Sequence, residues 1–135
     1  MTKPLLRSVL AILAGYVTMV LGVTSTLAIL FFVARDALPA TPGPFRGPGW
    51  VLWLELGCGL AAAVLGGYVC ALVARRRELL HAVVLGGFAL LLGLIGSGAE
   101  AGLKPQWSSI AIAIVGAIGP VLGARLRLRH AALLR

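Results

Sequence analysis

One carboxylate inside a long apolar segment, Glu55, is the residue of this sequence best placed to do chemistry. Charged groups are costly inside a bilayer, so an ionisable residue in a membrane span is a functional candidate. Glu55 is expected about 7 Å below the membrane surface, because a helix rises about 1.5 Å per residue. Three roles stay open: a structural ion pair or helix cap, contact with a partner subunit, or a proton- or cation-coupled transport site. Its candidate pairing partners are Arg35, Arg46 and Lys104.

The remaining groups that could bind a metal or act as nucleophiles are few and far apart. His81 is expected at a membrane interface beside Glu78, and His130 is the only other histidine. We regard His81 as a second candidate for a functional or interface role. Cys58 and Cys70 lie in one predicted helix about 18 Å apart along its axis, too far for a disulfide. The sequence therefore predicts no metal site and no cofactor.

Patterns typical of enzymes are missing from the sequence. It has no paired carboxylates, no Ser/His/Asp or Cys/His constellation in polar surroundings, and no nucleotide-binding loop. Its Gly-Gly pairs at 66–67 and 86–87 lie inside apolar segments, where no phosphate is cradled. We expect no catalytic residues and no enzymatic activity.

Four long apolar segments make up most of the sequence and must position Glu55 and His81. They are 8–34, 50–74, 79–99 and 107–124. With 60% hydrophobic and 12% charged residues, the chain lies outside the range of soluble globular proteins. A helix needs about 20 apolar residues to cross the hydrocarbon core. In lipid the backbone must satisfy its own hydrogen bonds, which leaves helices for such continuous segments. The sequence predicts one all-α domain over residues 1–135, an integral membrane four-helix bundle.

Basic residues are concentrated on one side of the predicted spans, with nine Lys/Arg against three on the other. Such a bias over short loops predicts that the basic side is cytoplasmic, with both chain ends inside. Trp50, Trp53 and Trp107 fall at the opposite ends, where aromatic rings anchor helices in the interface. The basic groups are expected to contact anionic lipid headgroups and to set topology, without binding nucleic acid. They are Lys3, Arg7, Arg75, Arg76, Arg77, Arg125, Arg127, Arg129 and Arg135.

Small residues recur at a spacing of four along two of the segments. In lipid, close approach of helix backbones at Gly and Ala drives packing. The rows predict packing within the chain, with self-association or docking to a partner subunit as the alternatives. Pro120 is expected to kink or loosen the fourth helix. The rows consist of Gly59, Ala63 and Gly67 in the second segment and Gly119 and Gly123 in the fourth.

The junction between the two middle segments resembles that of small four-span bacterial inner-membrane proteins of uncharacterised function. Those proteins join their middle helices through a glycine-tyrosine pair, basic residues and a histidine-alanine pair. The resemblance implies a bacterial inner membrane location and a four-span topology, and it carries no active residues across. The matching residues here are Gly66-Gly67-Tyr68, Arg75-Arg76-Arg77, His81-Ala82 and Gly86-Gly87.

Taken together, these features favour a non-catalytic membrane subunit or scaffold. It would pack through small-residue helix faces in a larger membrane complex or in a homo-oligomer. The alternative is a small oligomeric transporter or channel that uses Glu55. Expected partners are the bilayer, including anionic headgroups, and another membrane protein or a second copy of the chain.

Overall fold

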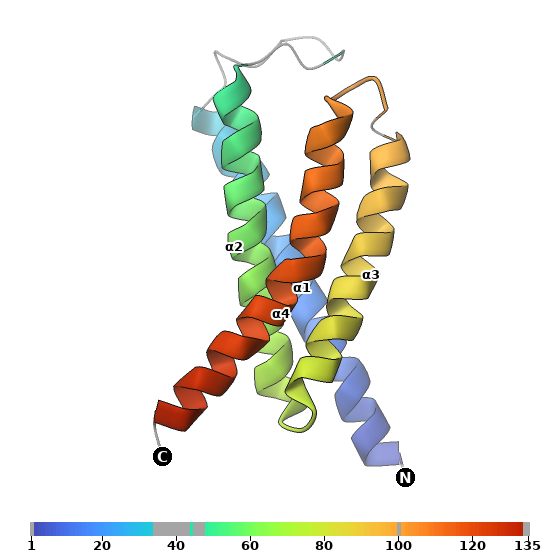
Figure 1. Cartoon of the computed structure of the whole chain (residues 1–135), viewed down its shortest axis with the longest axis vertical. Coiled ribbons are helices and arrows are strands. Elements are labelled where there is room, and N and C mark those ends of the chain that lie inside the picture. The colour runs from blue at the N-terminus through green and yellow to red at the C-terminus, as the bar shows by residue number, and fades with distance from the viewer. Residues whose placement is uncertain (1, 34–43, 45–47, 100, 134–135) are drawn as a thin grey trace.

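Four long helices make up the protein in a computed structural model that describes residues 2–33, 44, 48–99 and 101–133 (Figure 1). All four are long and apolar enough to cross a membrane, and no strand occurs in the described part of the chain. The predicted all-α class with four membrane-spanning helices is confirmed. The helices are α1 (Thr2–Val33), α2 (Gly49–Ala74), α3 (Glu78–Ala99) and α4 (Gln106–Leu133).

Two helices extend beyond the apolar segments. α1 begins at Thr2 instead of residue 8, and α4 continues through the arginine-rich segment to Leu133 instead of ending at 124. Arginine and leucine are good helix formers, so these ends stay helical without hydrocarbon around them. The proline- and glycine-rich connection expected at 35–49 lies largely outside the described residues.

The helices do not follow chain order across the bundle, because α4 lies between α2 and α3 (Figure 1). α4 packs extensively on both, whereas α2 and α3 diverge from the short link that joins them. The short link does not keep α2 and α3 side by side along their whole lengths. It holds only their ends together, because the small residues of α4 allow it to pack between them.

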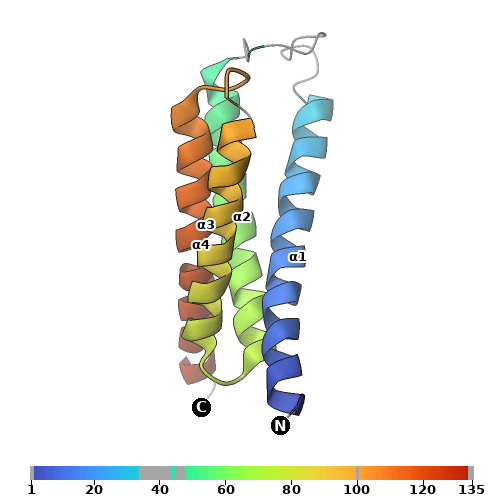
Figure 2. The same cartoon turned by 90° about the vertical axis from the view of Figure 1, so that its right-hand side faces the viewer.

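α1 is the least enclosed helix of the four. It packs on α2 and touches α3, and among the described residues it has no contact with α4. Figure 2 shows α1 standing beside the other three helices. Both chain ends lie at the same end of the bundle as the α2–α3 link, and the α3–α4 link lies at the other (Figures 1 and 2).

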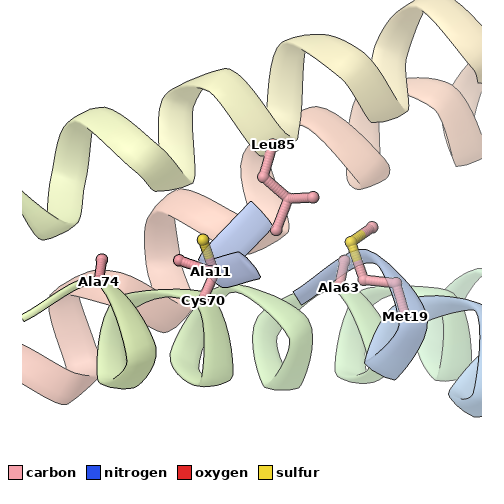
Figure 3. Packing of buried hydrophobic residues seen from close by; sticks show 6 residues of the cluster. All are labelled: Ala11, Met19, Ala63, Cys70, Ala74 and Leu85. Atoms are coloured by element: carbon pink, nitrogen blue, oxygen red, sulfur yellow. The ribbon is translucent and has the colours of Figure 1, made fainter. Parts of the chain in front are cut away.

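Small side chains build the packed interior. One cluster joins α1, α2 and α3 (Figure 3), and a second, of Ala71, Ala82 and Ala124, joins α2, α3 and α4. Alanine lets helix backbones come close, and van der Waals contact then replaces the hydrophobic drive that is missing in lipid. The first cluster consists of Ala11, Met19, Ala63, Cys70, Ala74 and Leu85.

Glycines determine how closely α2 and α4 approach. A Cβ added to Gly119 would overlap the Cβ of Ala63, and one added to Gly67 would overlap the backbone at Pro120. A Cβ on Gly123 would overlap the backbone of α2. The structure thus places four residues of the predicted rows in the contact between α2 and α4, and Pro120 lies inside α4 at this contact.

Gly59 differs from the rest of its predicted row. Apart from the backbone of α2 itself, no described atom lies within 4 Å of the position a Cβ would take on Gly59. The reason is that α2 and α4 diverge toward the end opposite the chain termini (Figure 1). Gly59 therefore makes no close packing contact with another described helix and instead lines a cleft.

Candidate functional site

Glu55 forms an ion pair with Lys104 at the end of the bundle away from the chain termini. Lys104 Nζ donates a hydrogen bond to Glu55 Oε1 at 2.6 Å, and the two side chains are 27% and 18% exposed, respectively. Lys104 belongs to the α3–α4 link, where Gly102 adopts a φ of 85° that favours glycine. The pair therefore ties α2 to this link. The other two expected partners, Arg35 and Arg46, lie outside the described residues.

Three tryptophans lie at the same end of the bundle as this ion pair. The rings of Trp53 and Trp107 lie with their centroids 5.7 Å apart, tilted by 42°. Trp50, Trp53 and Trp107 are all exposed, as expected of rings that face lipid headgroups. The contact joins the first turns of α2 and α4, so the aromatic pair and the ion pair reinforce the same end.

A lateral cleft of about 240 Å³ opens between α1 and the other three helices. Its α1 wall includes Tyr16, Met19 and Thr24. The opposite wall is formed largely by small residues, because the glycine and alanine rows of α2, α3 and α4 turn toward it. These small residues are Gly59, Ala63, Ala89, Gly93, Ala113 and Gly116.

Next to the cleft, a small hollow of about 40 Å³ lies at Glu55. The hollow is lined by Glu55 and Thr26, and it shares Gly59 and two other residues with the cleft. Thr26 Oγ1 donates a hydrogen bond to the carbonyl oxygen of Gly22 at 2.9 Å, which satisfies the hydroxyl locally. Glu55 thus lies beside the outer end of the cleft while it is paired with Lys104.

A second polar cluster, at the basic end, joins the start of α3 to the end of α4. Arg127 Nη1 lies 4.0 Å from Glu78 Oε2. Glu78 Oε2 and Arg127 Nε are buried and have no hydrogen-bond partner among the described residues. A buried polar group left in this way costs about 1–3 kcal/mol. These two side chains and Arg75 line a cavity of about 540 Å³.

Sequence reasoning missed this cluster. Arg127 was assigned with the other basic residues to headgroups and topology, and Glu78 was noted only as a neighbour of His81. The two residues are far apart in the sequence, and they meet because α4 packs along α3. The sequence did contain one signal for this site. Glu78 is the first residue of α3, where the helix dipole favours a carboxylate.

His81 stabilises the link between α2 and α3. Its Nδ1 lies 3.0 Å from the carbonyl oxygen of Arg77, one turn back. Arg75 and Arg77 have left-handed φ values of 55° and 50°, and the Arg75 N–H donates to the carbonyl oxygen of Ala71 to end α2. The structure does not bring His81 to Glu55, so the two candidate residues belong to opposite ends of the bundle.

Other basic residues assigned to the lipid interface lie at the same end of the bundle, whereas Arg135 and the side chain of Lys3 lie outside the described part of the protein. Arg76, Arg125 and Arg129 are exposed. Arg7 Nε donates a hydrogen bond to the carbonyl oxygen of Val73 at 3.1 Å, which fastens the start of α1 to the end of α2. The basic end therefore combines exposed arginines with one arginine, Arg127, that turns into the bundle.

Within residues 2–33, 44, 48–99 and 101–133, no group of three His, Cys, Asp or Glu residues is arranged to hold a metal ion. No family model, curated protein or solved structure matches this chain. Its function is therefore argued from geometry. Three features enter that argument: the Glu55–Lys104 ion pair, the lateral cleft, and the cavity at the basic end.

Proposed function

We propose that this membrane protein is a non-catalytic subunit or scaffold that packs against another membrane protein or a second copy of itself. The observation that carries the proposal is the lateral cleft with its wall of small residues. Helices associate in lipid where small residues let backbones approach closely. Gly67, Gly119 and Gly123 are already buried in the contact between α2 and α4. The cleft offers a second surface of small residues.

The position of α1 supports the same proposal. Only 11% of its most apolar stretch is buried inside the protein, against 33% for α2 and for α4. α1 is therefore held mainly by one neighbour, and the cleft lies on its side toward the others. A helix from a partner could lie in the cleft and contact both α1 and the wall of small residues, which are separated there.

The pairing of Glu55 favours a structural role for this carboxylate over a transport role. A carboxylate that loads and releases a proton or cation must exchange partners during its cycle. Lys104 contacts Glu55 at 2.6 Å and balances its charge within the chain. Pairing of an intramembrane charge with an opposite charge is the usual way in which its cost is offset.

One observation favours the second candidate, a small oligomeric transporter or channel. Glu55 lines a hollow that shares three lining residues with the cleft, so the carboxylate lies close to a space a solute could occupy. Glu55→Gln separates the two functions. If the protein is a subunit, Glu55→Gln leaves assembly nearly intact, and neither the wild type nor the variant transports a solute. For a transporter, it abolishes proton- or cation-coupled flux into proteoliposomes while the protein still assembles.

The first test is purification of the tagged protein into nanodiscs with its native lipids, followed by mass spectrometry of what is recovered. We expect a stoichiometric membrane partner or a defined homo-oligomer. Gly59→Leu fills the cleft and should lower recovery of the partner at least tenfold, because overpacking an interface costs about 1–3 kcal/mol.

Gly57→Leu is the matched control, since Gly57 is on the same helix, has open surroundings and does not line the cleft. It should leave the complex intact. Recovery of the protein only as a monomer, both in native-lipid nanodiscs and in gentle detergent, would contradict the proposal. Equal loss of the partner in both variants would show that the cleft is not the interface.

The basic end is proposed to face the cytoplasm of a bacterial inner membrane. The argument is that the charge bias and the tryptophans mark opposite ends of the bundle. Green fluorescent protein fused after residue 135 should fluoresce, and alkaline phosphatase fused there should be inactive. Alkaline phosphatase inserted in the α3–α4 link should be active. The reverse pattern would show that the basic end faces outward.

A further inference from the structure

The cavity at the basic end has unmatched hydrogen-bonding groups of both kinds. Arg127 Nε needs an acceptor and Glu78 Oε2 needs a donor, and neither finds one among the described residues. The two side chains cannot satisfy each other at 4.0 Å, because hydrogen bonds of this type are about 2.7–3.2 Å long. A ligand for this place must bring an acceptor and a donor together.

The charges around the cavity further restrict which ligands could bind there. Arg75 and Arg127 contribute two positive charges and Glu78 one negative charge, which leaves a net charge of +1. The rest of the lining is apolar and comes from the last turns of α4, with Leu128, Ala131 and Ala132. The ligand that fits carries one negative charge, a hydrogen-bond donor and an apolar part.

The geometry points to a binding site for one phosphatidylglycerol headgroup in this cavity, between the α2–α3 link and the end of α4. Its phosphate oxygens accept from Arg127 and approach Arg75, and a glycerol hydroxyl donates to Glu78 Oε2. The acyl chains lie along the apolar surface of α4 that continues from Leu128. Basic pockets between membrane helices bind other anionic headgroups, those of cardiolipin and phosphoinositides.

This site differs from general attraction of arginines to an anionic surface. General attraction depends on net charge and treats all singly charged phospholipids alike. The cavity adds an acceptor, Glu78 Oε2, which a headgroup hydroxyl satisfies and which a headgroup without a hydroxyl leaves unpaired. Phosphatidylmethanol has the same charge as phosphatidylglycerol and no hydroxyl, so the two lipids separate the explanations.

The test measures lipids retained on the purified full-length protein by native mass spectrometry, after reconstitution in phosphatidylcholine with either lipid added. We expect one molecule of phosphatidylglycerol to be retained, at least about tenfold more tightly than phosphatidylmethanol. Equal retention of the two lipids would overturn the proposal. Displacement by millimolar glycerol 3-phosphate would assign the site to a soluble ligand and would also overturn it.

Arg127→Gln should reduce retention of phosphatidylglycerol by about tenfold or more, because it removes a charged donor to the phosphate. Arg129→Gln makes the same change of charge at an exposed position and should have little effect. Equal effects of the two variants would show that the lipid is retained by general attraction to the arginines, and would overturn the proposed site. Arg75→Gln, on the exposed link, repeats the test if Arg127→Gln fails to fold.

Glu78→Ala provides the complementary measurement. It removes the acceptor and leaves both arginines, so anionic lipid should still bind. The preference for phosphatidylglycerol over phosphatidylmethanol should then fall to about one, since no hydroxyl acceptor remains. A preference that persists in this variant would contradict the role assigned to Glu78.

Discussion

Replacing Gly123 with leucine is expected to separate α2 from α4 and to prevent accumulation of the folded protein. A Cβ on Gly123 would overlap the carbonyl oxygen of Val64 and lie 2.7 Å from the amide nitrogen of Tyr68. Both are backbone atoms of α2, which cannot rotate away as a side chain would. We expect a loss of about 3 kcal/mol or more, measured by thermal melting in detergent and by membrane expression.

Gly87→Leu is the control for this prediction. Gly87 lies in α3, and no described atom lies within 4 Å of the position its Cβ would take, apart from the backbone of α3 itself. The same substitution should therefore not lower stability and could raise it by up to about 1 kcal/mol, because leucine has a higher helix propensity than glycine. If Gly123→Leu melts like Gly87→Leu, the contact between α2 and α4 is not the one described here.

Exchange of the charges of the Glu55–Lys104 ion pair is the second change with a large expected effect. Lys104→Glu would place two carboxylates together in a half-buried site and should lower stability by about 2 kcal/mol. Glu55→Lys should do the same with two ammonium groups. The double variant Glu55→Lys/Lys104→Glu restores an attractive pair, and we expect it to recover at least about 1 kcal/mol over the sum of the single changes.

Arg76→Glu is the comparison for Lys104→Glu, because it reverses a charge on an exposed link away from this pair. Thermal melting of the variants in one detergent gives the coupling free energy. A double variant no more stable than the additive sum would show that Glu55 is not held by Lys104. The transport role of Glu55 would then become the better explanation.

Membrane insertion and helix number could be predicted from hydropathy alone. Each apolar segment is continuous, and lipid permits only helices for such segments, so residues 50–74 and 79–99 matched α2 and α3 to within one residue at each end. The helix ends near charged residues were less predictable. In α4, helix propensity carries the structure to Leu133, nine residues past the predicted end.

Contacts between helices could be predicted only in part. Gly59 and Gly67 belong to one row with the same spacing, yet Gly67 packs on Pro120 and Gly59 lines a cleft. The difference arises from the divergence of α2 and α4, which spacing along one helix does not encode. The contact between Glu78 and Arg127 was missed for a related reason, because it depends on which helices are neighbours.

The placement of α4 between α2 and α3 has a consequence for biogenesis. α2 and α3 are synthesised as a hairpin, but the partner on which each of them packs most extensively emerges from the ribosome afterwards. The packing of α2 and α3 is therefore completed only once α4 has been inserted. Until α4 is in place, the glycines of α2 that pack on it, Gly67 among them, have no helix against them.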